Sequence, residues 1–431
     1  MTTSTTPNLL IKGGSILDPV SGETREADIL IEDGQIVSIQ KGIADGDAQT
    51  YDASGRMISI GWMDMHVHLR EPGFEHKETI ESGCQAAAFG GFTAVACMPN
   101  TNPPIHTRDV VEFIIERAEA TPVDVFPIAC VSKYRKGENL AEMADLAEGG
   151  AVAFSDDGDP VQDTGLMRHA LEYSAMLGKP IINHEEDLPL GPKGHMHEGE
   201  VSTRLGLAGI PTLSEEIMIA RDILLAGYTG GHIHVAHIST AGAVDLVREG
   251  KKKGINVTTE VCTHHFTLTD EAVETSNFDT HMKMHPPLRT QVDIDAIKVG
   301  LADGTIDAIC TDHAPHASFE KEVEFVAAPF GILGLETAWG LTGREIVDTG
   351  VLTVAEAVQK LTVAPRKIMN VDLPRMEEGA RANLTIFDAT TEWTFEAEHI
   401  HSKSVNTPFV GSKMKGRAWA VYNKGKLVLN D

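Results

Sequence analysis

The stretch MDMHVHLREPG, at residues 63–73, brings together side chains that can bind metal ions and anions. His66 and His68 lie two positions apart, so both imidazoles point to the same face of a β-strand. Neutral imidazoles are good ligands for zinc and similar divalent ions. Arg70 adds a guanidinium just beyond the end of the same apolar run. The spacing therefore predicts a metal-binding pair with a cationic neighbour.

Carboxylates and further histidines end other apolar runs of the chain. They are Asp156 and Asp157 in FSDDG, His184 in INHEED, His237 in VAHIST and Asp312 in CTDHAPH. A single buried histidine is more often a core residue than a ligand, and a His-x-His pair alone is a weak signal. Ligand-type residues at five predicted strand ends favour a metal site. Four histidines and two aspartates exceed the needs of one tetrahedral zinc and suit two metals that share a ligand.

Eight apolar, strand-like runs must position these residues, and helix-period segments such as 109–120, 164–178 and 213–226 lie between them. The runs are 59–69, 92–100, 123–131, 151–157, 180–187, 232–239, 256–265 and 306–316. Alternation of strands and helices predicts a parallel sheet, and eight strands fit a closed (β/α)8 barrel, of the TIM type, over residues 58–370. A doubly wound open sheet is the alternative, but no Gly-x-Gly-x-x-Gly turn follows the first strand. We expect Ser214 to cap the third of these helices.

Residues 1–57 and 371–431 have a different pattern, with short alternating runs separated by Gly and Asp-Gly turns. Both ends of the chain are therefore expected to form one small β-sandwich domain beside the barrel. In a barrel, active sites lie at the carboxyl ends of the strands, so the polar residues that end the eight runs should meet at one mouth.

Composition limits the partners and the compartment. A net charge of −27 argues against nucleic acid and anionic membranes, which need clustered positive charge. Five scattered cysteines without a Cys-x-x-Cys pair do not form a disulfide framework, which favours a reducing cytoplasm. The N-terminal residues do not resemble a signal peptide, and no apolar run approaches the roughly 20 residues of a membrane helix.

Together these motifs resemble the bacterial type I dihydroorotases of the amidohydrolase superfamily. The matching segments are MDMHVHLREPG, GGFTAVACMPNTNPP, AFSDDGDPVQD, INHEED, VAHIST, KMHPPLR, CTDHAPH and APFGILGLETA. The resemblance covers nearly the whole chain. It implies the reversible interconversion of N-carbamoyl-L-aspartate and L-dihydroorotate in pyrimidine synthesis, by a hydroxide that the metals generate.

The resemblance also implies a ligand set for one or two Zn²⁺ ions in a binuclear site. His66 and His68 would bind one metal together with Asp312, and His184 and His237 would bind the other. Asp157 matches the second Asp of the family's FSDDG and would bridge the metals, where many relatives use a carboxylated lysine. Asp312 would also be the catalytic residue, as general acid and base.

Substrate contacts follow from the same resemblance. Arg70, Asn100 and His316 would receive the substrate carboxylate, and Arg70 offers a planar fork for bidentate binding. His68 would face the substrate as well as the metal. The expected contacts to the substrate ring are His285, where the family usually has Asn, and the backbone of Phe330 and Gly331.

Two other functions remain open at this point. Another cyclic amidase, such as a hydantoinase, allantoinase or dihydropyrimidinase, would share the barrel and the metals. A non-catalytic scaffold of aspartate transcarbamoylase is disfavoured because every expected ligand is intact. Aspartate transcarbamoylase is still a candidate partner, and a homo-oligomer is expected. Residues 317–329 could form a mobile loop over the mouth or an ordinary surface loop.

Overall fold

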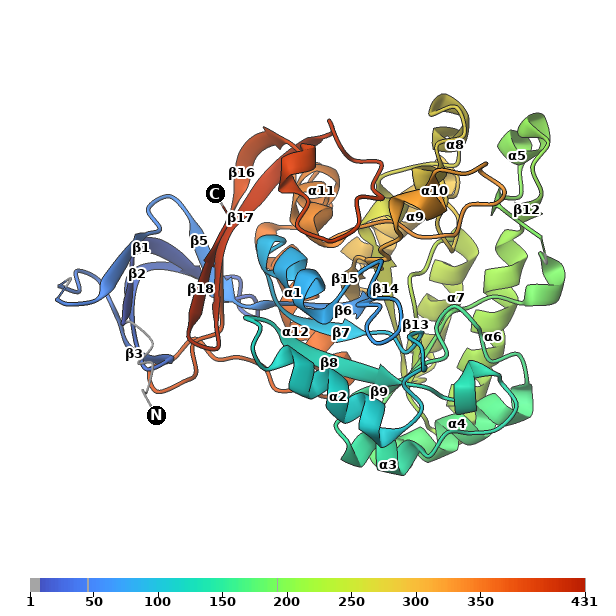
Figure 1. Ribbon diagram of the computed structural model, residues 1–431, viewed down its shortest axis with the longest axis horizontal. Helices are drawn as coiled ribbons and strands as arrows, with labels where there is room; N and C mark the ends of the chain where they lie inside the picture. The colour runs from blue at the N-terminus through green and yellow to red at the C-terminus, as the bar shows by residue number, and fades with distance from the viewer. Residues whose placement is uncertain (1–7, 45, 192, 431) are drawn as a thin grey trace.

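Two eight-stranded sheets dominate the computed structural model, which describes residues 8–44, 46–191 and 193–430 (Figure 1). One sheet is the barrel in the middle of the chain, and the other combines strands from both ends of the chain. This arrangement confirms the predicted fold class. Within the described residues, no helix is long and apolar enough to cross a membrane.

The barrel sheet consists of parallel strands that follow one another in chain order. They are β6 (Trp62–Val67), β7 (Phe92–Cys97), β8 (Asp124–Ala129), β9 (Ala153–Phe154), β10 (Ile181–Asn183), β13 (Ile233–Val235), β14 (Val257–Cys262) and β15 (Ala308–Cys310). A parallel bridge between Val67 and His313 joins the first strand to the chain that follows the last one, and so closes the ring. Each strand lies inside one of the eight predicted runs, and the open, doubly wound alternative was wrong.

Helices cover the outside of the barrel (Figure 1). The longer ones are α1 (Ile80–Phe89), α2 (Arg108–Ala118), α4 (Thr164–Leu177), α6 (Thr212–Thr229), α7 (Ala241–Lys252), α9 (Gln291–Ala302) and α12 (Val354–Met369). The shorter ones are α3 (Met143–Glu148), α5 (Glu200–Leu205), α8 (Glu271–Thr275), α10 (Ser318–Lys321) and α11 (Ala338–Thr342). The expected cap at Ser214 was wrong. Helix α6 begins at Thr212 after the extended Pro211, and the Ser214 hydroxyl in its first turn donates to the carbonyl of Asp187 instead.

The second sheet contains strands from both termini. They are β1 (Leu9–Leu17), β2 (Thr24–Glu32), β3 (Gln35–Gln40), β4 (Gln49–Asp52), β5 (Met57–Ile60), β16 (Leu384–Thr394), β17 (Lys413–Asn423) and β18 (Lys426–Leu429). A short two-stranded sheet, β11 (Met196–His197) with β12 (Gly209–Ile210), lies apart from both. Only Gly61 separates β5 from β6, so the terminal sheet is directly connected to the first barrel strand.

Apolar side chains fill part of the inside of the barrel. Met63, Ala94, Ile128 and Ile182 form one buried cluster there with Met369 from the end of α12. Apolar packing therefore fills the barrel interior, and polar residues such as His184 and Asp312 follow the ends of the strands.

Candidate active site

A pocket of about 340 Å³ lies at the carboxyl end of the barrel. The residues predicted from the sequence that line it are His68, Arg70, Asn100, Asp157, His184, His237, His285, Asp312, His316, Phe330 and Gly331. His66 is completely buried beside it. The fold thus brings every predicted ligand and substrate-contacting residue to one place.

Each predicted ligand lies in its strand or within three residues of the strand's end. His66 is in β6 and His68 directly follows it, while Asp157 comes three residues after β9. His237 and Asp312 have φ angles of 31° and 48°, a left-handed conformation that is uncommon for residues other than glycine. Residues held in such conformations cluster at functional sites.

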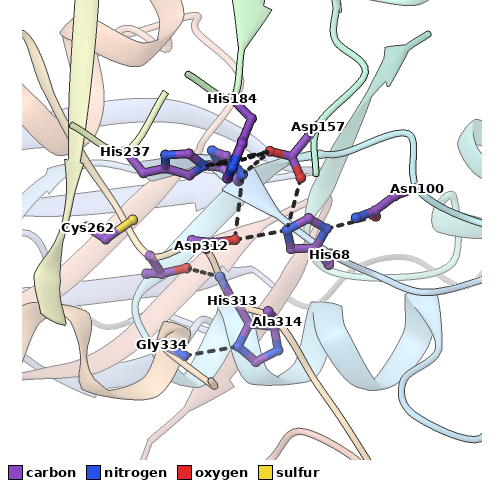
Figure 2. Close-up of polar contacts among 12 residues, drawn as sticks. His68, Asn100, Asp157, His184, His237, Cys262, Asp312, His313, Ala314 and Gly334 are labelled. Carbon is purple, nitrogen blue, oxygen red and sulfur yellow. Dashed lines mark hydrogen bonds and ion pairs between the residues drawn. The ribbon is translucent and has the colours of Figure 1, made fainter. Parts of the chain in front are cut away.

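Asp157 occupies the centre of the histidine cluster (Figure 2). Its Oδ1 lies 3.4 Å from His66 Nε2 and 3.7 Å from His237 Nε2. The same oxygen is 4.0 Å from His184 Nδ1, and Oδ2 is 3.6 Å from His68 Nε2. Burial raises the pKa of this carboxyl, but the neighbouring histidines, His66 first, hold it well below its usual value. Asp157 is therefore an ionised carboxylate shared by all four rings.

Asp312 lies against the first two histidines. Its Oδ1 is 2.8 Å from His68 Nε2 and 3.6 Å from His66 Nε2. Burial raises the pKa of Asp312, whereas the hydrogen bond from His68 and the nearby His66 lower it below its usual range. A second buried carboxylate thus faces the same two imidazole nitrogens.

Outer hydrogen bonds fix how the first two rings present their nitrogens. His66 Nδ1 lies 2.6 Å from Glu260 Oε1, and His68 Nδ1 lies 2.8 Å from Asn100 Oδ1. Both partners are acceptors, so each Nδ1 carries the proton and donates it. The Nε2 atoms of both rings then face Asp157 and Asp312. Contacts of this kind orient metal-binding histidines and increase their basicity.

The other two rings are held less tightly. His184 Nδ1 lies 3.0 Å from His237 Nε2, and His184 Nε2 is 3.7 Å from Glu186 Oε2. His237 Nδ1 is buried and has no hydrogen-bond partner among the described residues. Two imidazole nitrogens at this separation either share one proton or face one cation together.

The cluster has the composition and the unsatisfied atoms of a two-metal site. His66, His68 and Asp157 present ligand atoms within 4.8 Å of one another, and so do Asp157, His184 and His237. In the described part of the chain, the buried atoms His66 Nε2 and Asp157 Oδ1 have no hydrogen-bond partner. Buried polar atoms rarely lack partners, and a divalent cation in each group would satisfy them. The residues therefore fit a pair of metal ions that share Asp157.

Arg70 lies at the edge of the pocket as a buried cation. Its Nε donates to the carbonyl of Pro315 at 3.1 Å, and no carboxylate of the described chain forms an ion pair with it. Burial lowers its pKa to about 10, so it stays charged at neutral pH. Nη2 is 3.5 Å from His316 Nε2, which donates to the carbonyl of Phe330 at 2.8 Å. Burial and the charge of Arg70 lower the pKa of His316 to about 2, so His316 is neutral. This corner of the pocket suits an anion.

Known proteins resemble this chain over nearly its whole length. A family model described as "Dihydro-orotase-like" matches residues 55–243. The dihydroorotase of Pelotomaculum thermopropionicum is 52% identical over 98% of this chain and 99% of its own length. That of Syntrophus aciditrophicus is 48% identical, again over 98% and 99% of the two chains. This chain belongs to the dihydroorotase family.

Solved structures of the same fold are more distant in sequence. The L-hydantoinase of Arthrobacter aurescens superposes with a TM-score of 0.86 at 24% identity, over 98% of this chain and 96% of the other. The dihydropyrimidinase of Brevibacillus agri gives a TM-score of 0.84 at 23% identity, over 98% and 95%. These likenesses extend the barrel and terminal sheet of the dihydroorotase family to other cyclic amidases.

Four further positions near the predicted site differ in what their residues contact. Asp157 lies among the histidines, whereas Asp156 accepts hydrogen bonds from the backbone and hydroxyl of Ser132 and points away from the cluster. His285 Nε2 is 3.1 Å from Glu186 Oε2, and its ring stacks on Phe330 with centroids 4.7 Å apart. Gly331 has a φ of 118°, and a Cβ there would come within 2.6 Å of the Ala314 side chain.

Two buried lysines attach the segment after β15 to the barrel. Lys283 Nζ donates to the carbonyls of Phe325 and Val326 at 2.9 and 3.0 Å. Lys321 Nζ donates to Pro329 at 2.8 Å and to Thr280 at 3.2 Å. The segment before the pocket residues Phe330 and Gly331 is therefore held by hydrogen bonds to Thr280 and Lys283.

Two carboxylates of the site were not predicted from the sequence, Glu260 behind His66 and Glu186 between His184 and His285. Glu260 lies within the apolar run of β14 and is completely buried. A charged residue inside a predicted barrel strand was the signal that could have found it. Glu186 follows His184 by two residues, but INHEED offers three acids and does not distinguish them.

Proposed function

We propose that this chain is a dihydroorotase that interconverts N-carbamoyl-L-aspartate and L-dihydroorotate in pyrimidine synthesis. The observation that carries the proposal is Arg70, a buried cation beside the histidine cluster that has no carboxylate partner in the described part of the chain. Dihydroorotate has both features that such a pocket would recognise, a cyclic amide and a carboxylate. The proposal agrees with the family to which the chain belongs.

We infer that the site takes two zinc ions. His66, His68 and Asp312 would bind one ion, His184 and His237 would bind the other, and Asp157 would be shared. Imidazole and carboxylate donors suit zinc. When bound, the ions would supply a Lewis acid for the ring carbonyl and lower the pKa of a water to about 7.

Asp312 is our candidate for the proton carrier. Its depressed pKa keeps it ionised, so it can accept a proton from the attacking water. Its Oδ1 is held by His68, which fixes the carboxylate toward the pocket. During ring opening Asp312 would deliver the proton to the leaving ring nitrogen, and during ring closure it would take that proton back.

The opposite wall would bind and orient the substrate. Arg70 can form two parallel hydrogen bonds to the substrate carboxylate, and Asn100 and His316 flank it. The ring would lie near His285 and the backbone of Phe330 and Gly331. In this arrangement the carboxylate fixes the substrate, and the cluster acts on the amide at the other side.

A substrate comparison with metal removal tests the proposal. Purified protein is assayed with dihydroorotate, hydantoin and allantoin, before and after dialysis against a chelator. We expect dihydroorotate to be the best substrate, chelation to abolish turnover and zinc to restore it. A preference for hydantoin would contradict the substrate assignment, and full activity without metal would contradict the metal assignment.

A further inference from the structure

A second cavity lies at the amino end of the barrel, away from the mouth. Its volume is about 790 Å³. Its walls come from the first residues of β8, the end of α2, the segment 372–383 that leads from α12 to β16, and Lys424 at the turn between β17 and β18. The cavity thus lies between the barrel and the terminal sheet.

One wall carries a buried cation with few partners. Arg366 on α12 is only 3% exposed and lines the cavity. Among the described residues, its guanidinium makes a single hydrogen bond, from Nη1 to the carbonyl of Thr362 at 3.0 Å. Burial lowers the pKa of Arg366 to about 10, so it remains charged at neutral pH. A buried cation is costly unless an anion pairs with it.

The acids around the cavity do not supply that anion. The charge of Asp124 raises the pKa of Arg366, but Asp124 forms its ion pairs with Arg381 at 3.3 Å and Lys424 at 3.4 Å. Arg375 pairs with Glu377 at 2.6 Å. Glu119 and Asp372 also line the cavity, but neither forms an ion pair with Arg366. Four cations and three acids line the cavity, in a chain whose net charge is −27.

We propose that this cavity binds a small organic anion through Arg366. A phosphate or carboxylate group would accept hydrogen bonds from the free side of the guanidinium, whose planar fork suits either group. The apolar part of the ligand would lie against Ile115, Ala118 and Leu373. The volume falls in the range of about 300–1,000 Å³ that is common for small-molecule sites. This site is separate from the proposed reaction at the mouth.

Inorganic phosphate is the probe for the test, because it carries the anionic group alone. Binding to the full, metal-loaded chain is followed by ³¹P NMR line width at constant ionic strength. Three variants are compared: Arg366→Met, Arg70→Met at the mouth, and Arg168→Met, which removes an exposed arginine paired with Glu172 on α4. We expect saturable binding that Arg366→Met weakens at least tenfold and that the other two variants retain.

Several results would overturn the proposal. These are an absence of saturable binding, an unchanged affinity in Arg366→Met, or a loss of binding in Arg70→Met, which would place the phosphate at the mouth. If Arg366→Met does not fold, Arg381→Gln replaces it, because this side chain is 55% exposed. Without Arg381, the negative charge of Asp124 beside the cavity is less neutralised and repels phosphate more strongly. We therefore expect weaker phosphate binding in Arg381→Gln, and an unchanged affinity would refute the site.

Discussion

The two halves of the histidine cluster differ in how firmly their rings are held. In the half built on β6 and β15, Glu260 and Asn100 accept hydrogen bonds from His66 and His68 at 2.6 and 2.8 Å. In the half built on β10 and β13, the corresponding contact of His184 is 3.7 Å long, and His237 has none among the described residues. The first half is preorganised for a ligand, and the second half is not held to the same degree.

The difference extends to charge. In the first half, Glu260 contacts His66 and Asp312 contacts His68. Burial lowers the pKa of His66, but the charges of Glu260 and Asp157 raise it well above its usual value. Among the described residues around the second half, Glu186 is the one additional carboxylate in contact, and it is shared with His285. We therefore expect the first half to bind its metal more tightly, so that the second ion leaves first.

The largest expected effect is on the proton carrier of the first half. Asp312→Asn should lower kcat by about a thousandfold, because a positioned acid–base group contributes roughly 10²–10⁴-fold. Steady-state kinetics and circular dichroism would check activity and folding. Asp156→Asn is the matched control, since Asp156 contacts Ser132 rather than the cluster. Near-normal turnover in Asp312→Asn would show that Asp312 is not the proton carrier.

Arg70 follows β6 and should bind the substrate rather than the metal. Arg70→Met should raise KM for dihydroorotate by about a hundredfold, which corresponds to roughly 3 kcal/mol for a lost charged pair. Metal content should stay unchanged. Hydantoin lacks a carboxylate, so residual turnover of hydantoin should not fall. An equal loss on both substrates would show that Arg70 supports the pocket in a general way.

The two halves can be compared directly through their outer carboxylates. Glu260→Gln should weaken metal binding about ten- to a hundredfold, as loss of an outer-shell partner typically does. Glu186→Gln should have a smaller effect, because its contact with His184 is 3.7 Å long. Competition with a chelator, followed by metal counting, gives both affinities. If the two variants lose metal equally, the halves do not differ in the way their geometry indicates.

Much of the fold and site followed from one rule, that polar residues at the ends of apolar runs meet at the mouth of a barrel. His184 and Asp312, which are 128 positions apart, could be placed together because each ends such a run. The rule does not predict which of two adjacent polar residues points into the site. Asp156 and Asp157 end the same run, and only the path of the backbone after β9 turns one toward Ser132 and the other toward the histidines.

Contacts made from the middle of a strand were beyond this rule. Glu260 reaches His66 across the barrel interior, and the two are 194 positions apart in the chain. The buried Arg366 lies on a helix and was also not predicted, because its cavity exists only where α12, β8 and the segment 372–383 come together. Periodicity predicts which face of an element is buried, but not which distant polar group it meets.

His285 should have the smallest effect, and it tests how far the second half extends toward the substrate. Its Nε2 is 3.1 Å from Glu186, and its ring lies on Phe330, so the side chain is held by the protein. His285→Asn would keep a hydrogen-bonding group there and lose the stacking. If the backbone of Phe330 and Gly331 provides the ring contacts, KM should change by no more than about fivefold, the equivalent of one neutral hydrogen bond. A larger change in KM, with metal content unaltered, would mean that His285 itself contacts the ring, and that the less firmly held half of the cluster takes part in substrate recognition.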